Sequence, residues 1–406
     1  MITRWQEVNL VSAVKARRAV HLTGVRQCGK STLAGLVPLS NPRRYTFDDD
    51  AMRLTAEGDP RGFVVRKPGE TIVIDEVQKV PAILNAIKMQ LDASNEKGQY
   101  LLTGSSNLRF AKAVTDSLAG RMRTVRLRTL SQGEICGGAG DFLLKAFRRE
   151  FPDAVSGFGK REVIDMAFKG GYPEVLELDA SERRYWFEDY LNDLLMKDIR
   201  DVTEIRKLQA LRDISDWLMA YSSKFFEIKD LAAQSGVKQD TVKSYIEGLK
   251  AIYLFDEIEP WTKSDYAKLG KRSKYFASDP SLIANVLGWS AEETYFDDDK
   301  SGKIVETWVY HELASLADRN PGMKIRQYRD SDRREIDFLI ENEASETLGI
   351  EVKSGSAIGL GDFKHLKWFA RTLSPGRFTG VVLYAGDRTL PFGEGFYAVP
   401  LGALTL

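Results

Sequence analysis

The feature that most constrains this chain is a glycine-bracketed loop near its start. Residues 24–32 read Gly-Val-Arg-Gln-Cys-Gly-Lys-Ser-Thr and fit the phosphate-binding pattern G-x-x-x-x-G-K-[ST] at every specified position. The preceding residues, 19–23, look like a short buried strand, and residues 32–37 can start a helix. Such a strand–loop–helix turn points backbone N–H groups at phosphate oxygens. The chain is therefore predicted to bind a nucleoside triphosphate.

The chemistry expected of this loop can be assigned residue by residue. The predicted nucleotide contacts are Gly24, Val25, Arg26, Gln27, Cys28, Gly29, Lys30, Ser31 and Thr32. Lys30 would reach the outer phosphates, and the Ser31 hydroxyl would ligate Mg²⁺. Farther along, an apolar strand delivers Asp75 to hold the metal through water and Glu76 to polarise the attacking water. The acid pair alone is weak evidence, but together with the loop it predicts hydrolysis of ATP with Mg²⁺.

The first part of the chain alternates strand-like and helix-like segments. Strands are expected at 44–47, 71–75, 100–103 and 124–127, and helices at 82–91 and 107–118. This alternation predicts a three-layer α/β domain with ligands at the carboxyl ends of its strands.

Two further groups were considered for the phosphate site. Ser105, Ser106 and Asn107 follow a strand and either touch the γ-phosphate or its water, or cap the next helix. The sequence does not choose among them, although Asn107 is included in the predicted binding site. Arg121 either stabilises phosphate charge, in its own subunit or a neighbour's, or is an ordinary solvated arginine.

Composition excludes several classes of protein. A chain of 406 residues suggests about two to three domains. Lys plus Arg equals Asp plus Glu at 58 each, so any DNA-binding surface must be local. Two cysteines do not make a disulfide framework, which favours a reducing cytoplasm. Three histidines without clustered cysteines do not favour a structural zinc site. No signal peptide or membrane span is recognised, so no membrane partner is expected.

Three motifs together resemble those of the prokaryotic AAA-type ATPases: the loop at 24–32, Ile-Val-Ile-Asp-Glu-Val-Gln at 72–78, and Leu-Thr-Gly-Ser-Ser-Asn at 102–107. More closely, the chain is similar to the family that joins an AAA_14 domain to a C-terminal DUF4143 region. Supporting motifs lie at 118–121, 130–134, 170–174 and 276–280, so the likeness covers nearly the whole chain. The resemblance implies an AAA-like ATPase domain.

The middle of the chain has the pattern of a helix-turn-helix. A short helix at 228–233, a turn containing Gly236 and a second helix at 238–250 precede a strand that resembles a wing. Several side chains of the second helix could face a major groove: Lys238, Gln239, Thr241, Lys243 and Ser244. A basic stretch at 263–274 could neutralise phosphates. The alternatives are an internal lid or a dimer contact, so DNA and a homo-oligomer both stay open as partners.

The last part carries a nuclease-like set of residues. Asp337 lies on one predicted strand, and Glu351 and Lys353 share a face of the next. They match the Asp…Glu-x-Lys signature of restriction-endonuclease-like folds, in which the carboxylates bind Mg²⁺ and the lysine activates water. Glu306, on a preceding helix, resembles the extra metal-binding acid of many such folds. The alternatives are a degenerate nuclease fold kept for binding, or a plain charged hairpin.

The sequence thus predicts four segments of an α/β protein. They are an AAA-like P-loop ATPase domain at 1–135, a helical linker or lid at 136–220, a winged-helix-like domain at 221–275, and a PD-(D/E)XK nuclease-like domain at 276–406. Residues 288–303 are expected to be an acidic connecting loop. The predicted function couples ATP hydrolysis to DNA binding or processing. The alternative is a nucleotide-dependent switch that binds a protein or DNA partner without cleaving it.

Overall fold

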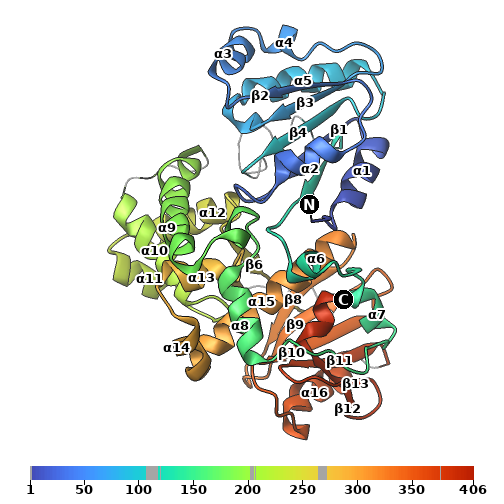
Figure 1. Cartoon of the computed structure of the whole chain (residues 1–406), viewed down its shortest axis with the longest axis vertical. Helices are drawn as coiled ribbons and strands as arrows, with labels where there is room; N and C mark the ends of the chain where they lie inside the picture. Colours follow the sequence, from blue (N-terminus) through green and yellow to red (C-terminus); the bar gives the residue numbers. More distant parts are fainter. Residues whose placement is uncertain are drawn as a thin grey trace.

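The computed structural model describes residues 2–106, 118, 120–201, 205, 207–263, 272–374 and 376–406. Figure 1 shows an N-terminal part built on one sheet, a largely helical middle and a C-terminal part built on a second sheet. None of the helices in these ranges is long and apolar enough to cross a membrane.

The N-terminal part is a five-stranded parallel sheet in the order β2-β3-β4-β1-β5. Its strands are β1 (Ala19–Thr23), β2 (Pro42–Thr46), β3 (Thr71–Asp75), β4 (Tyr100–Gly104) and β5 (Met122–Arg126). Its helices are α1 (Glu7–Ala16), α2 (Lys30–Leu36), α3 (Asp50–Gly58), α4 (Pro60–Phe63), α5 (Ala82–Ala93) and α6 (Gln132–Cys136). The central strands are apolar runs because helices cover both faces of the sheet.

Successive residues of β3 show how the two faces are filled. Val73 packs in the cluster that contains α1 and α2, whereas Ile72 and Ile74 pack in the cluster that contains α5. The predicted three-layer domain and its strands are confirmed, with β2 and β5 each beginning two residues earlier than expected. The helix expected at 107–118 lies, except for residue 118, outside the described residues.

The middle of the chain is mainly helical. Its helices are α7 (Phe142–Phe147), α8 (Lys160–Lys169), α9 (Ala180–Met196), α10 (Leu208–Ala220), α11 (Ile228–Ser235), α12 (Gln239–Ala251), α13 (Pro280–Val286) and α14 (Ala291–Phe296). Strands β6 (Phe255–Ile258) and β7 (Lys274–Ala277) pair antiparallel beside them. Gly236, with φ +63°, ends α11 in the left-handed conformation that glycine favours, and α12 follows as the sequence predicted.

The prediction of a connecting loop at 288–303 is wrong. This segment holds α14 and the start of α15 (Asp298–Arg319). The Ser290 and Asp297 side chains accept backbone N–H groups of the following first turns and so cap both helices. The acids that suggested a loop lie in those first turns, where negative charge stabilises a helix N-terminus.

The C-terminal part is a six-stranded mixed sheet in the order β12-β13-β11-β10-β9-β8. Its strands are β8 (Lys324–Arg329), β9 (Glu335–Glu341), β10 (Thr347–Lys353), β11 (Phe378–Tyr384), β12 (Leu390–Pro391) and β13 (Phe396–Pro400). Strands β8, β9 and β10 are antiparallel neighbours; helix α16 (Lys364–Thr372) then leads to β11, which runs parallel to β10. Long helix α15 is buried along most of its length.

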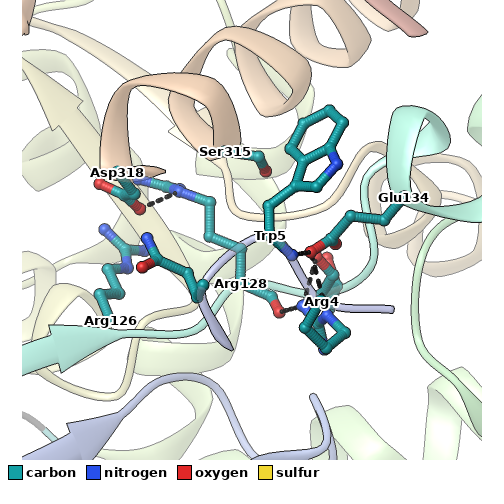
Figure 2. Close-up of a pocket in the computed structure, with 9 residues that line it drawn as sticks. Arg4, Trp5, Arg126, Arg128, Glu134, Ser315 and Asp318 are labelled. Atoms are coloured by element: carbon teal, nitrogen blue, oxygen red, sulfur yellow. Dashed lines mark hydrogen bonds and ion pairs between the residues drawn. The ribbon is translucent and has the colours of Figure 1, made fainter. Parts of the chain in front are cut away.

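The three parts meet at one buried charged junction. Asp256 of β6 accepts hydrogen bonds from Arg126 at the end of β5 (2.7 Å), from Arg128 just after it (2.5 Å) and from the Tyr310 hydroxyl of α15 (2.7 Å). Arg128 also donates to Asp318 of α15 at 2.7 Å, as Figure 2 shows. Burial would raise the pKa of Asp256, but the two arginines hold it well below its usual range. Charge pairing therefore joins segments that are far apart in the sequence.

Candidate nucleotide site

The loop after β1 has a backbone that requires glycine at both ends. Gly24 has φ +158°, and a Cβ there would lie 2.0 Å from the Leu127 carbonyl oxygen. Gly29 has φ +99° and immediately precedes α2. These positions let the chain turn tightly between strand and helix, as a phosphate-binding loop must.

Lys30 lies inside this loop. Its side chain is buried, and its ammonium donates to the carbonyl oxygens of Gly24 (3.1 Å) and Val25 (2.9 Å). Both acceptors belong to the loop itself, so the charge is held where phosphate oxygens would bind. Of the other predicted loop contacts, Val25 and Cys28 turn their side chains into the core, while Gln27 is exposed.

The predicted metal residues of the loop and of β3 come together. The Ser31 hydroxyl donates to one oxygen of Asp75 at 2.7 Å, and the Thr103 hydroxyl donates to the other oxygen. A cavity of about 260 Å³ adjoins them, and its lining includes Ser31, Thr46 and Asp75. One carboxylate and one hydroxyl suit Mg²⁺, which takes few protein ligands and keeps water and phosphate oxygens as the others. The donor set therefore fits a Mg²⁺–nucleotide, and Thr103 is a residue that the sequence reasoning missed.

Glu76 has an unusual backbone at the end of β3. Its φ of +55° and ψ of +44° are left-handed, a conformation that costs about 1–3 kcal/mol for a residue other than glycine. Its carboxylate accepts a hydrogen bond from the Gln78 amide and lies 3.5 Å from the Ser105 hydroxyl; Gln78 and Ser105 are themselves 3.1 Å apart. Of the three candidates after β4, Ser105 is thus the one in contact with Glu76. Asn107 lies outside the described residues.

Arg121 does not join this site. The parallel register pairs Met122 with Ala19, so Arg121 lies at the amino ends of the strands, whereas the loop follows their carboxyl ends. There its guanidinium donates to Asp92 at 2.5 Å. A role at the phosphate of its own subunit is therefore contradicted, because the length of the sheet separates the two.

The loop also contacts the helical middle. Arg26 forms an ion pair of 3.1 Å with Asp198, and its carbonyl oxygen accepts the Tyr190 hydroxyl at 3.1 Å. The Thr23 hydroxyl, one residue before the loop, lies 3.0 Å from that of Tyr253. From the other side, Arg4 donates to the Cys28 carbonyl oxygen at 2.8 Å. A change in loop conformation on nucleotide binding would therefore alter contacts with the middle of the chain.

The burial of His21 in β1 should make the free energy of unfolding depend on pH. Burial, and then the charge of Lys30, lowers the pKa of His21 from 6.5 to about 3, and its Nε2 is buried without a hydrogen-bond partner in the described residues. Below pH 6.5 the unfolded chain therefore binds a proton that the folded chain does not. We expect this residue alone to lower the free energy of unfolding by about 1.4 kcal/mol per pH unit below that pKa.

Urea denaturation of the wild type and of His21→Gln at several pH values between 7 and 5 measures this effect. The variant should lose that component of the slope, because glutamine does not protonate. Equal pH dependence in the two proteins would contradict a histidine kept neutral by burial.

The predicted nuclease residues converge only in part. Lys274 of β7 is buried, with its ammonium 3.1 Å from Glu306, 2.6 Å from Glu335 and 3.4 Å from Asp337. Burial would lower the pKa of Lys274, but these carboxylates raise it. Burial raises the pKa of Glu306 and also that of Glu351, on which the charge of Asp337 acts in the same direction.

Two features of this cluster differ from the prediction. In the described part of the chain, no group of three or more His, Cys, Asp or Glu side chains is arranged to hold a metal ion, so Glu306, Asp337 and Glu351 do not form the expected three-acid group, and their metal role stays a prediction. The Lys353 ammonium lies 3.5 Å from Asp362 of the segment before α16. The carboxylates of Glu306, Glu335 and Asp337 instead surround the Lys274 ammonium, which lies where a metal ion would bind.

The predicted basic stretch is also changed by burial. Lys274 cannot contact a phosphate because it is only 2% exposed, and Arg272 is paired with Glu227. Lys268 and Lys271 lie outside the described residues. By contrast, Lys238, just before α12, and Gln239 and Lys243 on α12 are exposed.

Comparisons with known proteins agree with this three-part architecture. Residues 16–136 match the family described as AAA domain (AAA_14), residues 160–293 match a domain of unknown function (DUF8612), and residues 301–404 match another (DUF4143). Uncharacterized proteins of Mycobacterium tuberculosis and Mycobacterium bovis are each 25% identical over 401 residues, covering 96% of this chain and 82% of the relative. The AAA_14 and DUF4143 segments predicted from the motifs are confirmed.

Among solved structures, the chain is similar to a Walker-type ATPase of Pyrococcus abyssi. The identity is 14% and the TM-score 0.43, covering 71% of this chain and 96% of that one. A RuvB variant of Thermotoga maritima is 17% identical with a TM-score of 0.30, covering 63% of this chain and 89% of that one.

Proposed function

We propose that this protein is an ATPase that works as a nucleotide-dependent switch. It carries an AAA domain before a helical middle and a DUF4143 region. Lys30 binds the outer phosphates, Ser31 and Asp75 hold Mg²⁺, and Glu76 polarises the attacking water. The observation that carries the proposal is the junction of Ser31, Asp75 and Thr103 beside a nearby cavity, with Glu76 next in the chain.

The catalytic steps follow from these positions. Mg²⁺ supplies neutralisation of charge on the β- and γ-phosphates. Lys30 exchanges its carbonyl acceptors for phosphate oxygens, and the Glu76 carboxylate accepts a proton from water as it attacks. Gln78 and Ser105 hold that carboxylate and thereby set its direction. Arg121 stays a candidate for the phosphate of a neighbouring subunit in a homo-oligomer.

The output of the switch would pass through the middle of the chain. Arg26, inside the loop, is paired with Asp198, and Thr23 contacts Tyr253 between α12 and β6. Phosphate binding requires the loop to accommodate an anion, which changes the surroundings of Arg26 directly. We infer that the nucleotide state biases the position of α11 and α12 relative to the sheet.

Duplex DNA is the partner that we propose for this middle segment. Helices α11 and α12 followed by strands β6 and β7 have the order of a winged helix, and Lys238, just before α12, and Lys243 on α12 are exposed. The C-terminal order of α15, three antiparallel strands, α16 and a parallel strand resembles a restriction-endonuclease-like fold. Because Lys274 lies between its carboxylates, binding without cleavage is favoured over nuclease action.

Fluorescence anisotropy with labelled duplex DNA tests this proposal. With Mg²⁺, we expect affinity to differ at least about fivefold between the ATP-bound and ADP-bound protein, and the DNA to stay intact on gels. Lys243→Glu should weaken binding, since it reverses a charge that would face phosphate.

The matched control is Lys197→Glu at the end of α9, because Lys243 and Lys197 are both exposed and each pairs with an aspartate of the adjoining helix turn. Equal affinities in all nucleotide states, or equal effects of the two substitutions, would overturn the DNA proposal. Metal-dependent cleavage by the wild type would favour the nuclease instead.

A further inference from the structure

A lysine from the helical middle occupies the carboxylate cluster of the C-terminal part. Lys274 starts β7, whereas Glu306 comes from α15 and Glu335 and Asp337 come from β9. The Lys274 side chain is 2% exposed, and its ammonium lies within 3.4 Å of all three carboxylates. The ring of Phe225 lies 5.3 Å from the same ammonium. This contact joins the middle and C-terminal parts, and the lysine in it is shielded from water, whereas Glu335 is partly exposed.

The cluster holds more negative than positive charge. Glu351 is a fourth acid beside Asp337, and its Oε1 is buried without a hydrogen-bond partner in the described residues. Asp337 uses its second oxygen to accept the backbone N–H of Val352 at 3.0 Å. The charge of Lys353 also acts on Glu351, although the Lys353 ammonium is paired with Asp362 at 3.5 Å. Lys274 is therefore a buried cation in direct contact with three of these four carboxylates.

We propose that Lys274 is a built-in cation that plugs this cluster, holding the middle and C-terminal parts together and keeping divalent metal out. The inference goes beyond the proposed switch and does not depend on ATP hydrolysis. Its physical basis is competition. Carboxylates suit either an ammonium or a hard divalent cation, and a charge of one sign buried alone is costly. When the lysine is removed, metal should enter in its place.

The test measures binding of Mn²⁺ alone by electron paramagnetic resonance in the full chain without nucleotide. Lys274→Met keeps an unbranched side chain and removes the charge. We expect this variant to bind Mn²⁺ at least about tenfold more tightly than the wild type. Adding Asp337→Asn to Lys274→Met should abolish the gain.

Lys250→Met is the matched control. Lys250 of α12 also bridges two carboxylates, Glu247 at 2.8 Å and Glu257, but these do not belong to the cluster. It should bind no more Mn²⁺ than the wild type. Equal Mn²⁺ binding by the wild type and Lys274→Met, or an equal gain in Lys250→Met, would overturn the proposal. The assay contains no nucleotide and compares variants that share the same phosphate loop, so failure of the proposed ATPase can be distinguished from failure of the plug.

If the Lys274→Met protein does not fold, a second measurement tests the proposal. Glu306→Gln and Asp337→Asn, combined with Lys274→Met, remove charge of both signs from the cluster. Recovery of a cooperative thermal transition in this triple variant would support the plug, because it shows that unbalanced charge caused the loss. If the triple variant is no more stable than Lys274→Met, the lysine acts through packing rather than as a cation, and the proposal fails.

Discussion

Replacing Lys30 with alanine is expected to lower ATP turnover by about 100-fold or more. The buried ammonium lies against two carbonyl oxygens of the loop, and no other lysine in the described residues shares that position. Its loss removes charge that neutralises the phosphates in the transition state, and removal of one such contact typically costs this much. Release of inorganic phosphate, with nucleotide binding measured by calorimetry, gives the result.

Lys97→Ala is the control for this prediction. Lys97 is exposed and lies just before β4, at the amino ends of the strands, whereas the loop follows their carboxyl ends. Its removal should change neither binding nor turnover. If Lys30→Ala retains the wild-type rate, the assignment of the loop as the phosphate site is wrong.

Replacing Glu76 with glutamine should separate binding from hydrolysis. The change keeps the size of the side chain and its contacts with Gln78 and Ser105 but removes the base, so turnover should fall by about 10²- to 10⁴-fold. ATP affinity should stay within about threefold of the wild type, because a group that acts on water in the transition state adds little to ground-state binding. Single-turnover hydrolysis and equilibrium binding of ATP measure the two quantities.

Glu57→Gln on exposed helix α3 provides the comparison for a surface glutamate. It should turn over ATP at the wild-type rate. A Glu76→Gln protein that loses ATP binding together with turnover would instead show that Glu76 has a structural role, consistent with its left-handed backbone.

The first domain was predictable because its signals are local. Runs such as β1 and β3 are continuous and apolar, and the glycines of the loop stand at fixed positions where the backbone needs them. What could not be predicted was the contact of Thr103 with Asp75, since it joins residues of two neighbouring strands, β4 and β3.

Lys274 shows the limit of sequence reasoning most clearly. In the sequence it belongs to a basic stretch, and basic stretches are ordinarily solvated surfaces. Its burial depends on carboxylates from α15 and β9, which are more than thirty residues away in the chain. No local pattern records such a pairing, whereas the caps Ser290 and Asp297 were local signals that the prediction of a loop overlooked.

The junction at Asp256 has a consequence for how this chain is inherited. The domain families divide it into neat modules, yet Arg126 and Arg128 of the first find their counter-charges on Asp256 and Asp318 in the others. If the AAA domain were exchanged for that of a distant relative, the new domain would lack the matching arginines and leave Asp256 buried and uncompensated. Recombination between such genes should therefore yield a stable protein only when all three segments are inherited as one unit.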